Sequence, residues 1–185
     1  MAPAGLDVRP TGDRARTALF NILERGPPPL RGCRFLDLFA GTGAVALEAL
    51  SRGAAEALLV EQAKPALEAI RANVAACREG DRARLVAADA ARLGPVTGRS
   101  FDIAFLDPPY HAGLLPPALD RLARGGWLAP GARVVCEVAA EEILELPSPA
   151  LEPEDARRYG AARLVFLRFR PAGSNGPDDS PHDRP

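Results

Sequence analysis

The sequence has few residues of the kinds that bind metals or form disulfides. Its 185 residues include three cysteines and two histidines, and no two cysteines form a Cys-x-x-Cys pair. Cys33, Cys77 and Cys136 stand alone in apolar or helical stretches, where free cysteines are usually buried and reduced. This pattern excludes a disulfide framework and a zinc site, so we expect no metal.

Long apolar runs are also missing. No stretch approaches the roughly 18 apolar residues that a membrane-spanning helix needs. The first ten residues, MAPAGLDVRP, have no apolar core of the kind found in secretory signals. We therefore expect a cytoplasmic protein that makes no membrane contact.

The composition is otherwise that of an ordinary globular domain. Hydrophobic residues make up 47% of the chain and charged residues 25%. We expect a single domain over residues 1–170, acting as a monomer, since this length can bury a sizeable core. Residues 171–185 contain almost nothing to bury and are predicted to form a disordered acidic tail.

Charge is nearly balanced over the whole chain but not along it. The formal net charge is −1, and Lys64 is the only lysine among 23 basic residues. Residues 1–34 carry six arginines against three acidic residues. Because arginine binds phosphate with two parallel donors, this segment is a candidate surface for nucleic acid. High arginine usage can also follow from genome composition, so charge alone does not decide the partner.

Strand-like apolar runs alternate with helical patterns along the chain. Helices are predicted at 13–25, 44–52, 64–77 and 114–124, the first with Thr11 or Asp13 as its N-cap. Strands are predicted at 34–40, 56–61, 83–88, 101–107, 132–138 and 162–169, with a short antiparallel strand between 147 and 159. Because these strands are almost continuously apolar, helices must cover both faces of the sheet. The pattern predicts an α/β fold with a doubly wound, mostly parallel sheet.

A glycine-rich turn, in LDLFAGTGAVALEAL, follows the first predicted strand and opens the next helix. Doubly wound sheets bind ligands at the carboxyl ends of their strands, near the switch in strand order. Glu61 closes the second strand, where a carboxylate can accept hydrogen bonds from both hydroxyls of a ribose. Asp89 follows the third strand and can meet an adenine amino group or, alternatively, cap a helix. Together they predict a pocket for an adenosine-bearing cofactor.

Two cofactors fit the glycine pattern. Gly41, Gly43 and Ala46 satisfy the dinucleotide signature G-x-G-x-x-G/A. Glu61 lies 18 residues after Gly43, as it would in a dehydrogenase. Asp37 favours S-adenosylmethionine instead, because its carboxylate would repel a pyrophosphate and attract an ammonium group.

The segment FDIAFLDPPY ends a buried strand with a carboxylate, two prolines and an aromatic ring. Proline fixes its own φ and restricts the preceding residue, so residues 107–110, which we call the stub, form a rigid segment. The Asp107 carboxylate and the Pro108 carbonyl can both accept N–H bonds from an exocyclic amine, which lets the amine lone pair point at a methyl donor. Tyr110 offers a face on which a base can stack. No cysteine lies beside a motif, so the carbon methylation that needs a covalent cysteine is not expected.

These residues resemble class I S-adenosylmethionine-dependent methyltransferases, in DLFAGTGAVALEALSRGA, VEQ and FLDPPY. The segment RPTGDRARTALFNIL narrows the resemblance to the RsmD family of bacterial 16S ribosomal RNA guanine-N2 methyltransferases. The resemblance runs from about Val8 to Phe169 and implies a seven-stranded sheet with an antiparallel C-terminal strand. It also implies methyl transfer to guanine N2 of 16S rRNA, with S-adenosylhomocysteine as the second product. We expect the substrate to be an assembling small ribosomal subunit.

The resemblance also assigns roles to individual residues. The cofactor would be held by Asp37, Phe39, Ala40, Gly41 and Gly43 at its methionine end, by Glu61 at the ribose, and by Asp89 and Ala90 at the adenine. The guanine amine would be received by Asp107, Pro108 and Tyr110. The N-terminal block, residues 9–25, would lie over the cofactor and face the RNA with Arg9, Thr11, Arg14 and Asn21.

Three other functions compete with this one. A DNA adenine-N6 methyltransferase also uses an Asp-Pro-Pro-Tyr stub, but the segments between the predicted strands are too short for a separate recognition domain. A protein glutamine methyltransferase usually has asparagine where Asp107 stands. A non-catalytic module that binds S-adenosylmethionine or RNA is disfavoured by the presence of Asp107, Glu61 and Asp89 together.

Overall fold

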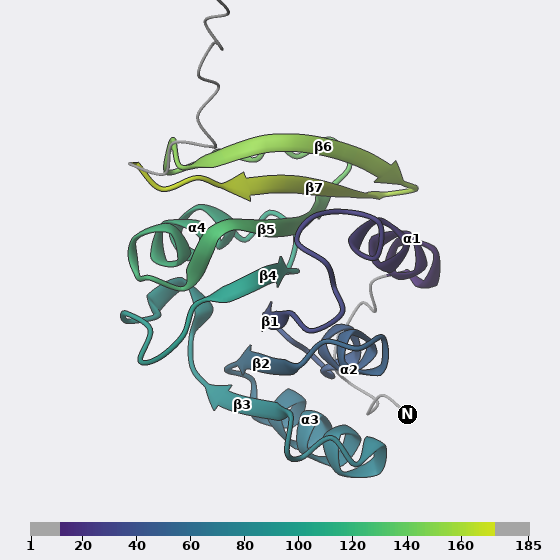
Figure 1. Cartoon of the computed structure of the whole chain (residues 1–185). Helices are drawn as coiled ribbons and strands as arrows, with labels where there is room; N and C mark the ends of the chain where they lie inside the picture. The colour runs from purple at the N-terminus through teal and green to yellow at the C-terminus, as the bar shows by residue number, and fades with distance from the viewer. Residues whose placement is uncertain (1–11, 173–185) are drawn as a thin grey trace, which may run out of the picture.

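A mixed β-sheet runs through the centre of the computed structural model, which describes residues 12–172 (Figure 1). Within these residues the sheet has seven strands in the order β3-β2-β1-β4-β5-β7-β6. The strands are β1 (Arg34–Leu38), β2 (Glu56–Glu61), β3 (Ala83–Ala87), β4 (Phe101–Leu106), β5 (Leu128–Ala139), β6 (Leu151–Tyr159) and β7 (Ala162–Phe169). Strands β1 to β5 pair in parallel, whereas β7 is antiparallel to both β5 and β6. The predicted α/β fold with an antiparallel C-terminal strand is confirmed.

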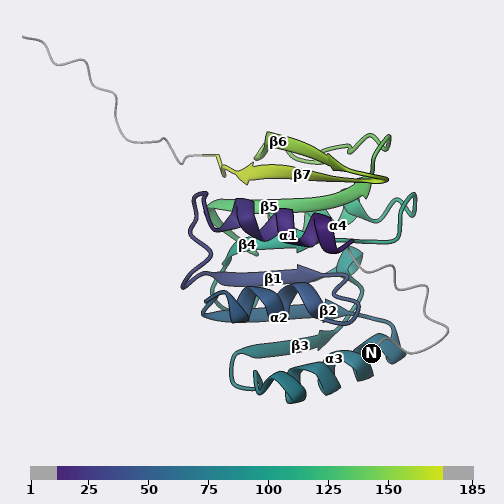
Figure 2. The same cartoon turned by 90° about the vertical axis from the view of Figure 1, so that its right-hand side faces the viewer.

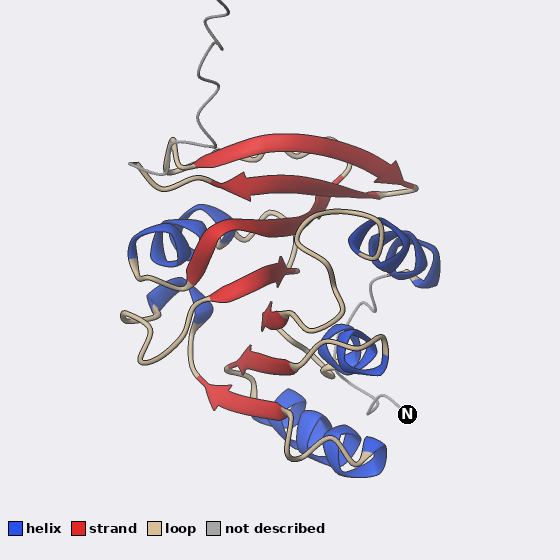
Figure 3. Ribbon diagram, viewed as in Figure 1, coloured by secondary structure: helices blue, strands red, loops and turns tan. Residues whose placement is uncertain are grey.

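Helices cover both faces of this sheet (Figures 1 and 3). One face carries α1 (Asp13–Leu23), α2 (Ala44–Ser51) and α3 (Lys64–Cys77), and the other carries α4 (Leu115–Arg124) and the short 3-10 helix η1 (Ala90–Arg92). Each face encloses its own apolar core. In β1, Phe35 packs on the α1–α3 side, whereas Leu36 and Leu38 pack on the α4 side. Burial from both sides explains why the central strands β1 and β4 are apolar at most positions.

The strand order places a topological switch between β1 and β4. The chain proceeds from β1 through β2 to β3 on one side, then returns to β4 and β5 on the other side of β1. At such a switch the loops that leave neighbouring strands diverge and open a crevice at their carboxyl ends. The structure therefore places the candidate ligand site at the ends of β1 and β4.

The N-cap of helix α1 is Gly12, which is neither of the residues expected there. Gly12 has extended φ and ψ of −53° and 137°, and no side chain caps the helix. The prediction of Asp13 as the cap is wrong because Asp13 is already the first helical residue. Thr11, the other candidate, lies outside the described residues. The helix ends at Leu23, two residues before the predicted end, ahead of the Gly-Pro-Pro-Pro segment.

Three strands have a boundary that differs from the prediction by more than one residue. Strand β1 ends at Leu38 instead of residue 40, because Phe39 turns out of the strand with φ of 63°. Strand β5 starts at Leu128 instead of residue 132, through an irregular pairing with β4 between Phe101 and Ile103. Strand β6 is nine residues long rather than short, because as the sheet's edge it needs few apolar residues and carries charges instead.

Two further findings concern membrane-spanning helices and metal sites. Among residues 12–172, no helix is long and apolar enough to cross a bilayer. The same part of the chain contains no group of three or more His, Cys, Asp or Glu residues arranged to hold a metal ion. The predicted disordered tail, 171–185, lies outside the described residues except for its first two positions.

Candidate active site

The ends of four neighbouring strands are tied together by backbone hydrogen bonds. The Ala40 N–H donates to the Val60 carbonyl at 3.1 Å, which joins the end of β1 to β2. The Ala88 N–H donates to the Glu61 carbonyl at 2.9 Å, and the Asp107 N–H donates to the Leu38 carbonyl at 3.4 Å. As a result, the segments after β1, β2, β3 and β4 lie side by side at one edge of the sheet.

The glycine turn after β1 depends on left-handed backbone conformations. Phe39, Gly41 and Gly43 have φ values of 63°, 55° and 77°. A Cβ at Gly43 would lie 2.8 Å from Leu59 Cδ2, so only glycine fits between the turn and β2 without displacement. Asn73 of α3 donates from Nδ2 to the Thr42 carbonyl at 2.9 Å and steadies the turn. The positive φ of Phe39 is a strained conformation of the kind that clusters at ligand sites.

Asp37 is a carboxyl group buried beneath this turn. It is 2% exposed, and its Oδ2 accepts a hydrogen bond from the Ala46 N–H of α2 at 3.1 Å. Burial raises the pKa of Asp37 from 3.8 to about 8; the hydrogen bond from Ala46 opposes this rise, and the nearby charges of Asp107 and Glu61 add to it. A positive charge nearby would favour the ionised form of this buried carboxyl group, so its surroundings are compatible with the positively charged ligand that the sequence predicts. A pyrophosphate would add negative charge to this acidic surrounding.

Glu61 is oriented by the backbone at the end of β2. Its Oε2 accepts from the Gly41 N–H at 2.9 Å, and its Oε1 accepts from the N–H groups of Gln62 and Ala63 at 2.8 and 2.9 Å. These bonds hold the carboxylate against the glycine turn. Three of the roughly four acceptor sites of the carboxylate are thus occupied, and Oε2 can still accept a bond from a ribose hydroxyl.

Asp89 caps a short helix, which is one of the two roles that the sequence predicted for it. Its Oδ1 accepts from the Ala91 N–H at 2.9 Å and caps η1, and its Oδ2 lies 3.5 Å from Arg92 Nε. The following Ala90 is buried at 3% exposure. Asp89 and Ala90 follow closely after the end of β3, at the edge of the sheet where β2 also ends.

The stub after β4 extends this edge on the other side of β1. Pro108 is buried, Pro109 is exposed, and the Tyr110 hydroxyl donates to Glu137 Oε1 of β5 at 2.9 Å. Glu137 is 4% exposed, so this bond holds the tyrosine ring from inside the sheet. The next residue, His111, has φ of 57° and bends the chain sharply away. The stub is thus a rigid, partly buried segment, as its prolines indicated.

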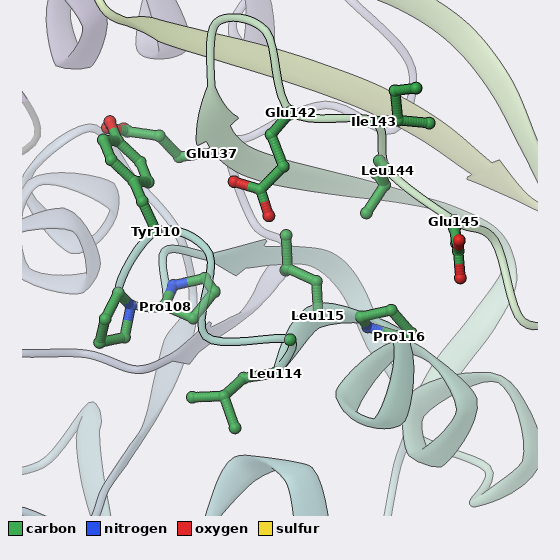
Figure 4. A pocket seen from close by; sticks show the side chains of 12 residues that line it. Pro108, Tyr110, Leu114, Leu115, Pro116, Glu137, Glu142, Ile143, Leu144 and Glu145 are labelled. Carbon is green, nitrogen blue, oxygen red and sulfur yellow. The ribbon is translucent and has the colours of Figure 1, made fainter.

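A cavity of about 190 Å³ adjoins the stub (Figure 4). It lies between the chain that leaves β4 and the loop that follows β5, and its lining includes Pro108, Tyr110, Leu115, Glu142 and Leu144. The sequence did not single out Glu137 or Glu142. A signal for Glu137 was present, because it is the one charged residue in the apolar run VVCEV.

The N-terminal block is only partly described. Helix α1 runs opposite to the parallel strands, so its first turn lies at the edge where those strands end (Figure 2). Arg14, in that turn, is exposed, and Asn21 is exposed about 10 Å further along the helix at 1.5 Å per residue. An ion pair of 3.0 Å between Arg16 and Glu48 joins α1 to α2. Arg9, like Thr11, lies outside the described residues, so the role of the block stays a prediction.

Comparison with known proteins connects this geometry to a family. The family model described as conserved hypothetical protein 95 matches residues 1–168. Ribosomal RNA small subunit methyltransferase D of Escherichia coli is 39% identical over 142 residues, covering 77% of this chain and 70% of that protein. The Haemophilus influenzae protein of the same name is 32% identical over 143 residues, covering 76% and 72%.

Solved structures agree with the fold. Escherichia coli yhhF superposes with a TM-score of 0.80 at 34% identity, over 92% of this chain and 91% of that one. The N-methyltransferase NodS of Bradyrhizobium japonicum, solved with S-adenosylhomocysteine, has a TM-score of 0.67 at 16% identity, over 91% and 92% of the two chains. The second likeness is one of fold alone.

The switch-point crevice, the glycine turn and the acidic strand ends define a class I methyltransferase whose cofactor is S-adenosylmethionine. A buried carboxyl beneath the turn and a backbone-held carboxylate at the end of β2 fit the charged and ribose parts of this cofactor. Within that class, the chain belongs to the conserved hypothetical protein 95 family, which is the RsmD methyltransferase family.

Proposed function

We propose that this protein methylates the exocyclic N2 of a guanine in the 16S rRNA of the small ribosomal subunit. The observation that carries the proposal is the rigid Asp107–Tyr110 stub beside the glycine turn, with a base-sized cavity next to it. The names of the E. coli and H. influenzae relatives, both small subunit rRNA methyltransferases, support an rRNA substrate.

The cofactor would be held by the residues at the ends of β1, β2 and β3. We assign Asp37 and the Phe39–Gly43 turn to its methionine end, Glu61 to its ribose, and Asp89 with Ala90 to its adenine. When bound, S-adenosylmethionine supplies an electrophilic methyl group on a positively charged sulfur, and S-adenosylhomocysteine remains after transfer.

The stub would prepare the guanine amine as the nucleophile. An aromatic amine is weakly nucleophilic because its lone pair is delocalised into the ring. Hydrogen bonds from its two N–H groups to the Asp107 carboxylate and the Pro108 carbonyl would let the nitrogen become pyramidal and aim its lone pair. After N–C bond formation the nitrogen would lose one proton, which Asp107 would accept. The Tyr110 ring, held by Glu137, would stack on the base.

The N-terminal block would supply RNA contacts. We assign this role to Arg9, Thr11, Arg14 and Asn21, of which Arg14 and Asn21 are exposed on α1. Taking a base out of its stack costs a few kcal/mol, so a single small domain gains from a substrate that presents the guanine already. We therefore propose that an assembling small subunit in the cytoplasm is the substrate, and that the protein acts as a monomer without a metal.

The first experiment incubates the protein with labelled S-adenosylmethionine and small subunits that lack the modification, then identifies the labelled nucleoside. We expect N2-methylguanosine in 16S rRNA. If no label enters the RNA, the assay is repeated with DNA and cofactor binding is measured separately. N6-methyladenine in DNA would then favour the DNA enzyme, and cofactor binding without transfer to either nucleic acid would favour a non-catalytic module.

Asp107→Ala tests the role of the stub in the same assay. We expect this variant to bind S-adenosylmethionine as wild type does and to lose methyl transfer. Asp81→Ala, at an exposed position before β3, is the control and should retain both. Equal loss of binding and transfer in Asp107→Ala would mean that this residue is structural.

Protein-free 16S rRNA tests the assembly requirement. We expect it to be methylated far less efficiently than the assembled particle. Equal rates on the two substrates would contradict that part of the proposal.

A further inference from the structure

The cavity beside the stub has one polar wall and one apolar wall. Pro108, Leu115 and Leu144 contribute the apolar surface, and the Glu142 carboxylate points into the space between them and Tyr110 (Figure 4). Its volume of about 190 Å³ is below the ~300–1,000 Å³ of sites that take whole drug-sized ligands. The space therefore suits a single planar ring system that enters along the stub.

Glu142, in the loop after β5, is held in place by hydrogen bonds to residues of β5 and β7. Its N–H donates to the Ala139 carbonyl at the end of β5 at 2.9 Å, and its own carbonyl accepts from the Arg163 guanidinium of β7. Its Oε2 lies 3.4 Å from the Ala139 N–H and 3.6 Å from His111 Nδ1. The side chain is 23% exposed, so the carboxylate is partly shielded from water yet still open to the cavity.

The two other glutamates that line the cavity are placed differently. Glu137 accepts a hydrogen bond from the Tyr110 hydroxyl and is buried at 4% exposure. Glu145 is exposed and lies at the far rim from Tyr110 (Figure 4). Glu142 is the carboxylate between these positions, next to the space that a base stacked at the stub would occupy.

We propose that Glu142 selects guanine by accepting a hydrogen bond from its ring N1–H, an inference that rests on the proposed function. In guanine, the ring nitrogen beside the amine carries a proton, so the amine and N1 together present a row of donors. Asp107 and the Pro108 carbonyl would take the amine protons, and Glu142 would take the next one. In adenine, the ring nitrogen beside the amine is an acceptor, and a carboxylate facing it is repelled and left without a partner.

A base that keeps the amine but lacks the ring proton tests this assignment. RNA is prepared with 2-aminopurine in place of the target guanine, assembled into small subunits, and compared with unmodified particles by kcat/KM. We expect wild type to prefer guanine by roughly 10- to 100-fold, the loss expected when a partly buried hydrogen-bonding group is left without its partner.

Glu142→Gln supplies the discriminating result. The glutamine amide can donate to the bare ring nitrogen of 2-aminopurine, so the preference for guanine should fall by about tenfold or more. Cofactor affinity and the thermal unfolding midpoint should stay at their wild-type values, which shows that the variant is folded. Glu141→Gln, on the same loop but 82% exposed in its side chain and paired with Arg158, should keep the wild-type preference.

An unchanged preference in a folded Glu142→Gln variant would overturn the assignment, as would an equal loss of activity on both bases. A wild-type protein that methylates adenine but no guanine would overturn this inference together with the proposed function. Wild-type methylation of guanine with no change in Glu142→Gln would overturn the inference alone.

Discussion

Replacing Asp37 with asparagine should stabilise the ligand-free protein at alkaline pH. Asparagine keeps the shape of the side chain and the oxygen that accepts from the Ala46 N–H at 3.1 Å, but it cannot ionise. In the wild-type protein, burial is the main cause that raises the Asp37 pKa from 3.8 to about 8. Between about pH 4 and pH 8, the folded state therefore still holds a proton that the unfolded chain has already released.

The size of the effect follows from the pKa shift. Since the folded state binds the proton more tightly, wild-type stability falls as pH rises through this window. At about 1.36 kcal/mol per pKa unit, the shift to about 8 removes roughly 3 kcal/mol of unfolding free energy between pH 6 and pH 9. For a chain of this size that corresponds to roughly 5–10 °C in the unfolding midpoint. The Asp37→Asn variant should not lose this unfolding free energy, because asparagine does not ionise.

Urea unfolding of both proteins at pH 6 and pH 9, without cofactor, measures the effect. Other titrating groups change stability equally in both proteins, so the difference between them isolates Asp37. We expect that difference to shift by about 3 kcal/mol in favour of Asp37→Asn at the higher pH. A difference that is the same at both pH values would refute the reasoning, because it would mean that the buried carboxyl does not change its charge across this range.

The same variant tests the proposed cofactor contact. If the ammonium group of S-adenosylmethionine faces Asp37, the carboxyl must lose its proton when the cofactor binds. Calorimetry at pH 7 in two buffers of different ionisation enthalpy should show proton release for wild type and none for Asp37→Asn, together with weaker binding by the variant. Equal affinity and equal proton release in the two proteins would mean that the ammonium group does not face Asp37.

Three further outcomes are expected from other parts of the structure. Tyr110→Phe removes the hydroxyl that donates to buried Glu137 and should lower the unfolding free energy by about 1–3 kcal/mol in urea; an unchanged value would mean that this bond contributes no net stability. Gly43→Ala places a Cβ 2.8 Å from a leucine side chain of β2 at φ of 77°, so it should weaken cofactor binding and stability. The control for that substitution is Gly80→Ala, which meets nothing within 4 Å and should change neither. Of the three thiols, Cys77 alone is exposed, so one thiol per folded chain should react with a thiol reagent, and rapid reaction of all three would contradict the burial of the others.

Local pattern was sufficient to predict most of the fold. The run FDIAFL is apolar on both faces because β4 lies between two covered faces of the sheet, and the structure has it as a strand from Phe101 to Leu106. The glycine turn was equally readable, since positive φ at Gly41 and Gly43 is a property of single residues. The length of β6 was not readable, because an exposed edge strand needs no apolar repeat.

The pairing of charges inside the sheet illustrates what local pattern leaves open. Arg133 of β5 lies directly opposite Arg168 of β7, and both are buried. Two like charges in such a pair would be unfavourable. Glu154 of β6 resolves this by accepting from Arg168 at 2.7 and 3.0 Å and from Arg133 at 3.4 Å. Nothing in the three separate segments predicts that they share one carboxylate.

The sequence by itself determined the succession of strands and helices along the chain. It also determined the glycine turn, the stub and the acidic residues at the strand ends. Each of these depends on the periodicity or backbone preference of neighbouring residues. Only the tertiary structure decided that Tyr110 would bond to Glu137, 27 residues later, and that Glu142 would face the cavity beside the stub. Those contacts depend on which strands become neighbours and in what register, and that outcome is a free-energy balance over the whole chain.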